Sequence, residues 1–526
     1  MTDPTRRRIV SGLAALAALP THARAQGERG RHGTGYDPRP FGFAEVERRA
    51  RDLAMAAYDG RVPPLPAGLD ALDYDAWRDI RFKPDQAFLD GSPFRLQLFH
   101  LGFLYKRPVT VNLVRGGIAT AIPYRASQFD LGRTRLNGPL PLDLGFAGIR
   151  LHTALNRPDL LDELMVFVGA SYYRFLGRDQ LYGLSARGLA VNTEAADGPE
   201  EFPVFREFWV EVPERGAETC TIHALLDGPS QAGAFRFTVH PGEESVVSVQ
   251  ATLYPRRELA TVGIAPLTSM YFIGETDRRH ADDYRPELHD SDGLQIAAGS
   301  GEWLWRPLNN PAARRISSFE DRGPRGFGLM QRDRAFEDYQ DLEASYQRRP
   351  SYFVEPEGDW GAGRVVLMEL PTDTETADNI VAFWRPETPY PAGEAVRLSY
   401  RVRAVMRRAL HPSAHVLNTF VADATASGAA RASAGPAGGL RRRFLVDFTG
   451  GELAYFLPDP SSLSVVASAT VGRIAATSIT VNPHIRGVRV AVDVVLDAPG
   501  STELRAFLKA GGRTLSETWS YPWTAA

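Results

Sequence analysis

The pattern of hydrophobic and polar positions divides the chain into one helical segment and a long series of short strands. From Phe43 to Tyr58, apolar residues recur every three or four positions with charges on the other face, which predicts an amphipathic helix. From about Phe94 the pattern changes to short alternating runs broken by turn residues. Such runs predict an antiparallel, two-layered β structure. They include Val109–Leu113, Glu207–Val212, Cys220–Leu225, Ala234–Val239, Val246–Leu253, Arg364–Leu370 and Val396–Val402.

A second unit follows a break in the strand pattern between Ala404 and His415. Seven strand-like segments then fit into about 110 residues, which suggests an immunoglobulin-like sandwich. We therefore predict an N-terminal domain over 36–404, a linker over 405–415 and a C-terminal sandwich over 416–526. The expected strands of the sandwich lie near 416–422, 441–448, 463–470, 474–481, 488–495, 502–508 and 515–521.

The first 25 residues have the pattern of an export signal. Thr5–Val10 contains the paired arginines of a twin-arginine signal, and the apolar run Ile9–Leu19 is too short to span a membrane, which takes about 20 residues. Ala23–Ala25 provides the small residues read by a signal peptidase, and residues 26–35 read as a tether. We expect a periplasmic protein that is exported by the twin-arginine pathway and does not span the membrane.

Charge and cysteine content narrow the partners and the source of stability. Residues 1–25 carry four arginines against one aspartate, so removing them shifts the formal net charge from −3 to −6. A mildly acidic chain without a basic block is a poor candidate for binding nucleic acid. Cys220 is the only cysteine, so stability must come from burial rather than from a disulfide. The sequence does not determine the oligomeric state, and a homodimer stays open.

Several common chemistries are excluded by the absence of their motifs. The chain has no phosphate-binding loop, no paired-histidine zinc motif and no nucleophile elbow. Asp290–Gly293 begins like a calcium loop, but the positions that should carry a ligand, a glycine and a glutamate are Leu294, Gln295 and Gly301. We therefore predict no metal and no cofactor.

Aromatic, carboxylate and amide residues concentrate between about 268 and 384. Aromatic faces can stack on sugar rings, polar side chains can pair with hydroxyls, and two carboxylates can provide the acid and base of glycoside cleavage. The candidate ligand-binding residues are Arg285, His289, Trp303, Trp305, Arg306, Trp360 and Trp384, and the candidate carboxylates include Asp290 and Asp378.

Each of these residues also has a purely structural interpretation. Trp303 and Trp305 share one face of a strand, so either ring could belong to the core. Asp292 and Asp373 lie in turn-like contexts, where an aspartate commonly caps its own backbone. Composition alone leaves both interpretations open.

Long runs of the sequence resemble the OpgG/OpgD (MdoG/MdoD) family of periplasmic glucan biosynthesis proteins. The twin-arginine signal favours the OpgD branch of that family. The resemblance covers essentially the whole chain after the signal. It is carried by 36–82, Gly169–Arg174, Tyr182–Ala190, Glu207–Trp209, Ser269–Tyr271, Tyr284–Leu294, Gly301–Pro311, Pro371–Trp384, Val446–Gly450 and Leu515–Tyr521.

This resemblance implies a fold and a reaction. The fold is a large N-terminal β-sandwich of the mutarotase-like supersandwich type, a short helical linker and an immunoglobulin-like domain. The reaction is inverting cleavage of β-1,2-glucan, with Asp378 as general acid and Asp290 as general base acting through a water and a substrate hydroxyl. Tyr346 and Glu375 match relay or positioning groups. Asp292 falls where at least one relative has asparagine, which argues against it as the essential carboxylate.

Three functions remain open at this point. The first is an inverting endo-β-1,2-glucanase that trims periplasmic glucan. The second is an inverting transglycosylase that passes the glycosyl unit to a sugar hydroxyl and makes cyclic or branched product. The third is a non-catalytic glucan-binding scaffold, for which aromatic platforms such as Trp303 would matter more than Asp378 and Asp290.

Overall fold

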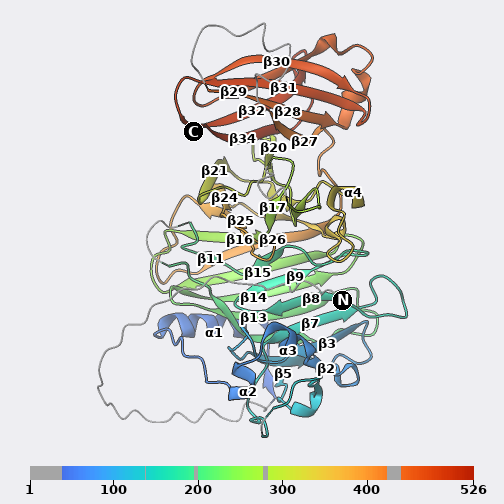
Figure 1. Cartoon of the computed structure of the whole chain (residues 1–526). Helices are drawn as coiled ribbons and strands as arrows, with labels where there is room; N and C mark the ends of the chain where they lie inside the picture. Colours follow the sequence, from blue (N-terminus) through green and yellow to red (C-terminus); the bar gives the residue numbers. More distant parts are fainter. Residues whose placement is uncertain (1–37, 137, 195–198, 277–281, 423–439, 526) are drawn as a thin grey trace.

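The computed structural model describes residues 38–136, 138–194, 199–276, 282–422 and 440–525. The predicted signal and tether, and the loop Ser427–Gly439, lie outside these residues. Strands make up about half of the described residues and far more than the helices do, so the prediction of an all-β protein is confirmed. Figure 1 shows two bodies stacked end to end, with the C-terminal strands at one end. The helices are α1 (Phe43–Met55), α2 (Ala67–Asp70), α3 (Tyr74–Asp79) and α4 (Phe336–Tyr339).

The larger body is built from two long sheets. One sheet has 16 strands and runs through both bodies, and the other has 10 strands. The larger sheet contains, in spatial order, β1 (Arg39–Pro40), β5 (Ile118–Ala121), β4 (Thr110–Arg115), β12 (Val204–Glu211), β13 (Cys220–Asp227), β14 (Gln231–His240), β15 (Val246–Pro255), β26 (Val396–Val405), β23 (Ser351–Glu357), β22 (Gly326–Met330), β19 (Gly293–Ala297), β20 (Trp303–Pro307), β34 (Thr518–Ala525), β32 (Gly500–Ala510) and β29 (Leu463–Ala469), with β33 (Arg513–Thr514) paired to β32.

The smaller sheet lies against the larger one, and short ladders complete the body. Its strands are β21 (Arg315–Arg322), β24 (Ala362–Glu369), β25 (Ile380–Pro386), β16 (Val262–Ser269), β10 (Ser185–Arg187), β9 (Tyr172–Phe175), β8 (Asp162–Val168), β7 (Gly148–Thr153) and β3 (Phe94–Phe99), with β11 (Ala190–Val191) paired to β16. The ladders pair β17 (Tyr271–Ile273) with β18 (Leu288–His289), and β2 (Arg81–Phe82) with β6 (Phe129–Asp130).

The core lies between the two long sheets because alternating residues of each strand face inward. In β15, Val247 and Val249 are buried while Ser248 and Gln250 between them are more exposed. Aromatic rings from both sheets meet across the interface, with the Phe237 ring centroid 5.0 Å from that of Phe167. Burial of these rings contributes both area and favourable edge-to-face contacts to the stability of the sandwich.

The predicted helix is confirmed as α1, which ends at Met55, three residues before the predicted end. Its apolar stripe, with Val46 and Ala50 fully buried, packs on the strand surface formed by Trp209, Leu225 and Tyr254. The helix therefore covers the outer face of β13–β15 rather than entering the core between the sheets.

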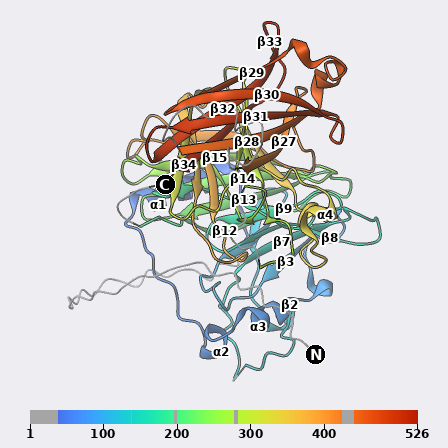
Figure 2. The same ribbon diagram turned by 45° about the horizontal axis from the view of Figure 1, so that its top comes forward.

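The C-terminal body is a two-layered sandwich with the predicted seven strands. A four-stranded sheet contains β27 (His415–Ala422), β28 (Leu440–Thr449), β31 (Gly487–Leu496) and β30 (Arg473–Asn482), and it faces β34, β32 and β29. If the seven longer strands are lettered A to G in chain order, the sheets are A-B-E-D and C-F-G, the arrangement of constant-type immunoglobulin domains. Figure 2 shows this sandwich from a second direction.

The junction between the two bodies differs from the helical linker that the resemblance implies. Residues 406–414, all of them described, contain no helix. Pro412 disfavours helical geometry at the residue before it. Individual residues of this segment instead form hydrogen bonds with the larger body. A second connection joins the bodies, since β34 pairs in parallel with β20 through Leu304 and Trp305. The last strand of the chain thereby extends the sheet of the first body, as Figure 1 shows.

Candidate active site

The two predicted carboxylates, here called the acid pair, approach each other from different strands. Asp290 directly follows β18, and its N–H donates to the Met270 carbonyl at 2.8 Å. Asp378 lies two residues before β25. The Asn379 side chain fixes that approach, since it accepts from the Tyr271 N–H at 2.8 Å and donates to the Tyr271 carbonyl at 2.9 Å. Both carboxylates are therefore held near the start of β17, Asp290 by its own N–H and Asp378 through the adjacent Asn379.

Asp290 is a buried carboxylate with its own counter-ion. It is only 5% exposed, and the Arg349 guanidinium donates to its Oδ1. The Tyr346 ring supports Arg349 from one face, with the guanidinium carbon 4.1 Å from the ring centroid. A charge buried in this way needs a partner, and the Arg349 guanidinium provides it.

Asp378 is in a different environment. Its side chain is 38% exposed, which leaves it open to a ligand on one side, while protein atoms crowd the other sides. Desolvation by these atoms raises the pKa of Asp378 above its usual value, although the positive charge of Arg174, 3.8 Å away, opposes this shift. The negative charge of Asp290 raises the pKa further. A carboxyl group that keeps its proton to higher pH is suited to donate it.

Tyr346 and Glu375 belong to one hydrogen-bonded network. The Tyr346 hydroxyl donates to Glu375 Oε2 at 3.1 Å, and Arg285 Nη1 donates to the same oxygen at 2.9 Å. Arg285 also binds Asp283 and Asp341. The network thereby fixes the Tyr346 side chain, whose ring contacts Arg349, the arginine that binds Asp290.

The predicted aromatic platforms do not gather around the acid pair. Trp384 is 1% exposed, and the Trp360 ring lies 6.4 Å from it and 5.9 Å from Tyr400, in the core of the larger body. Trp303 stacks against His411 and Phe353 at the junction of the two bodies. These rings pack against other side chains, which for Trp303 is the structural alternative that the sequence left open.

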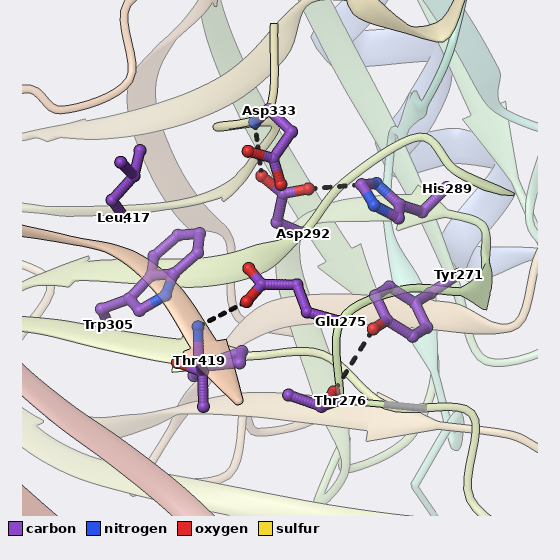
Figure 3. Close-up of a pocket in the computed structure, with 10 residues that line it drawn as sticks. Tyr271, Glu275, Thr276, His289, Asp292, Trp305, Asp333, Leu417 and Thr419 are labelled. Atoms are coloured by element: carbon purple, nitrogen blue, oxygen red, sulfur yellow. Dashed lines mark hydrogen bonds and ion pairs between the residues drawn. The ribbon is translucent and has the colours of Figure 1, made fainter. Parts of the chain in front are cut away.

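Three other predicted ligand-binding residues are interior as well. Arg306 is fully buried and donates to the Pro307 carbonyl and to Glu369. The Trp305 ring lies under the Arg332 guanidinium, 3.4 Å from its centre. A Cβ at Gly293 would come within 2.3 Å of that ring, so only glycine permits this packing. His289 is 1% exposed and contributes to a separate polar cavity rather than to the acid pair (Figure 3).

Several residues beside the acid pair were not assigned a role from the sequence: Arg174, Arg349 and Asn379. Arg349 directly precedes a proline and follows Tyr346 by one turn, a local pattern that could have connected it to the site. Arg174 is about 200 positions from Asp378 in the sequence, and nothing local links the two. Only the packing of β9 beside β10, β16 and β25 brings them together.

Comparison with known proteins decides the family. The family model described as "Periplasmic glucan biosynthesis protein, MdoG" matches residues 41–523. This chain belongs to the MdoG family. Membership gives it a role in glucan biosynthesis, and the family name implies the periplasm. Within the described residues, no helix is long and apolar enough to cross a membrane.

Relatives in the MdoG family match over nearly the whole chain. A protein of Rhodopseudomonas palustris (strain BisA53) named "Glucans biosynthesis protein G" is 43% identical over 523 residues, 99% of each chain. Proteins of the same name from Shewanella sp. (strain MR-7) and Shewanella frigidimarina are 46% and 45% identical, over 92% of this chain and 87% and 85% of theirs. A solved α-galactosidase from Geobacillus stearothermophilus is 11% identical over 49% of this chain and 39% of its own, with a TM-score of 0.24.

These relatives carry the G name. Assignment of this MdoG-family protein to the D branch, and its export by the twin-arginine pathway, stay predictions that depend on Thr5–Val10.

Proposed function

We propose that the protein is an inverting glycoside hydrolase that cleaves β-1,2-linked glucan. The observation that carries the proposal is the asymmetry of the acid pair. One carboxyl group is partly open and has a raised pKa, and the other is buried and accepts a hydrogen bond from an arginine. Glycoside cleavage by a pair of carboxyl groups needs one proton donor and one carboxylate, in inverting and retaining enzymes alike, and the inverting course comes from the family resemblance.

In the proposed reaction, Asp378 gives its proton to the departing glycosidic oxygen as the bond from the anomeric carbon to that oxygen breaks. Water attacks the anomeric carbon from the opposite face, and its proton passes to Asp290, so one bond forms and one breaks with inversion. Asp290 is only 5% exposed, which favours transfer through a water and a substrate hydroxyl rather than direct contact. We place the Tyr346 hydroxyl and Glu375 as groups that position this relay.

The same acid can serve a second reaction in which a sugar hydroxyl replaces water as the acceptor. The product is then a cyclic or branched β-1,2-glucan without a gain in reducing ends. A non-catalytic glucan-binding scaffold is the remaining alternative, and it predicts that neutralising either carboxylate leaves glucan handling unchanged.

One incubation separates these functions. Purified protein is mixed with linear β-1,2-glucan, and the products are analysed for reducing ends, for cyclic glucan and for the anomer first released. Hydrolysis predicts new reducing ends in the inverted, α configuration. Cyclic product without reducing ends would assign transglycosylation. If the protein binds the glucan and neither product forms, the enzymatic proposal is wrong and the scaffold remains.

A further inference from the structure

A second polar site lies at the junction of the two bodies, away from the open face of Asp378. It is a cavity of about 20 Å³, lined by residues of the larger body and by Leu417 and Thr419 of β27 (Figure 3). A volume of this size holds about one water molecule or a single ion. The remaining lining residues are Tyr271, Glu275, Thr276, His289, Asp292, Trp305, Pro307 and Asp333.

Four side chains around this cavity, here called the inner cluster, can each direct one ligand atom to a common point: Glu287, His289, Asp292 and Asp333. These four atoms all lie within 4.8 Å of one another. The sheet brings them together. Asp292 directly precedes β19, and Asp333 follows β22, the strand that pairs with β19. Glu287 directly precedes β18, and His289 is the last residue of β18. Opposite ligands of a six-coordinate ion are about 4.2–4.8 Å apart, twice a bond of about 2.1–2.4 Å.

The hydrogen bonds inside the inner cluster leave carboxylate oxygens without donors. Asp292 Oδ1 is inaccessible and has no hydrogen-bond partner among the described residues. His289 Nδ1 lies 3.0 Å from it, but that nitrogen also lies 2.9 Å from Gln331 Oε1, and a single ring proton serves only one of them. The Asp333 carboxylate faces that of Asp292 in Figure 3.

The charges around the cavity are also unbalanced. Glu275, whose Oε2 accepts the Thr419 N–H at 2.5 Å, adds a fourth carboxylate to the three of the inner cluster. Among the described residues, Arg332 pairs with Glu517, while Arg334 donates to the Gln347 and Arg349 carbonyls and its charge also acts on Asp292 and Asp333. In this part of the chain, four carboxylates therefore face the imidazolium of His289 and the guanidinium of Arg334.

We propose that Glu287, His289, Asp292 and Asp333 form a binding site for one divalent cation beside the turn that carries Asp290. Three carboxylates and one imidazole are a donor set suited to Mn²⁺ or Zn²⁺, and the majority of carboxylate oxygens favours Mn²⁺. The ion would replace the proton of His289 and supply the positive charge that the cavity lacks. Because Leu417 and Thr419 close the cavity, the ion would stabilise the junction as well as the turn.

The direct test uses the mature protein after dialysis against a chelator. Mn²⁺, Zn²⁺ and Ca²⁺ are titrated separately, with binding measured by calorimetry, stoichiometry by elemental analysis and stability by thermal unfolding. We expect one Mn²⁺ per chain and a Tm that rises with ion concentration. Electron spin-echo spectroscopy of the Mn²⁺ form should show coupling to one imidazole nitrogen. Failure of all three ions to bind would overturn the proposal and leave shared protons as the stabilising charge.

Matched variants locate the ion. Asp333→Asn should weaken Mn²⁺ binding at least tenfold, because it removes a ligand with no other bonding role for its side chain. Glu343→Gln, an exposed carboxylate of the following loop, should bind as the wild type does. Equal affinity in Asp333→Asn and wild type would also overturn the assignment. If Asp333→Asn does not fold, the His289→Gln variant is tested instead. Folded His289→Gln protein should bind Mn²⁺ without coupling to an imidazole nitrogen, and coupling that persists would contradict the assignment.

Discussion

The acid pair and the inner cluster are built on the same turn, and they differ in how their charge is compensated. Asp290 and Asp292 are two residues apart, yet Asp290 pairs with Arg349 while Asp292 faces another carboxylate. Asp378 is 38% exposed, whereas the side chain of Asp292 is 12% exposed. The comparison teaches that two carboxylates of one site can lie in different surroundings: an arginine binds Asp290, while crowding protein atoms raise the pKa of Asp378. A closed group of carboxylates without arginines instead requires protons or a cation.

The largest expected effect comes from removing the proton donor of the acid pair. Asp378→Asn should lower the rate of glucan cleavage about 10²–10⁴-fold, because general acid catalysis contributes on that order. Asp373→Asn, an exposed aspartate in the same loop, is the matched control and should retain activity. Reducing-end assays under saturating glucan measure both. A loss of less than threefold in Asp378→Asn would remove this residue from the mechanism.

The second prediction concerns the counter-ion of Asp290, which is removed so that Asp290, like the carboxylates of the inner cluster, has no arginine partner. Arg349→Met leaves Asp290 buried without its counter-ion, so the free energy of unfolding should fall by about 3–5 kcal/mol at neutral pH. Denaturant unfolding measures the change. Arg348→Met, the exposed neighbour, should change stability by less than about 0.5 kcal/mol. Equal effects of the two substitutions would contradict the difference in compensation.

The third prediction has the opposite sign. In metal-free protein, Asp333→Asn should increase the free energy of unfolding by about 1–2 kcal/mol at neutral pH, since it removes a carboxyl group that must stay charged without a partner or take up a proton on folding. The folded-state pKa of Asp333 lies above its unfolded value of 3.8. Folding therefore favours the protonated form, and wild-type stability falls as pH rises from 3.8 through the folded pKa. The gain from Asp333→Asn should be absent below pH 3.8 and complete above the folded pKa, as unfolding across pH will show.

The smallest effect is expected in the network behind the acid pair. Tyr346→Phe removes one hydrogen bond to Glu375, and cleavage should slow about three- to tenfold. If the hydroxyl positions the relay to Asp290, the loss should fall on kcat rather than on KM. Unfolding measured alongside should change by less than about 1.5 kcal/mol. A change in KM alone would assign Tyr346 to binding.

The sequence predicted the fold class and most elements correctly because local periodicity reports burial directly. The seven strands of the C-terminal sandwich lie within a few residues of their predicted ranges, and α1 begins at the predicted residue. The acid pair came from family resemblance, and long matching runs placed both carboxylates by position. The same runs carried no information on which aromatic rings are exposed, and Trp384 is buried in the core.

By itself, the sequence determined the family, the all-β architecture and the two carboxylates proposed for the reaction, because these depend on patterns within short stretches. Tertiary structure alone decided which charges meet. Arg174 reaches Asp378, Arg349 reaches Asp290, and Asp292 meets Asp333 across the β19–β22 ladder. It also joined β34 to β20, so that the second body closes the cavity around the inner cluster. Electrostatic energy depends on distance and burial in space, and neither can be read from positions along the chain.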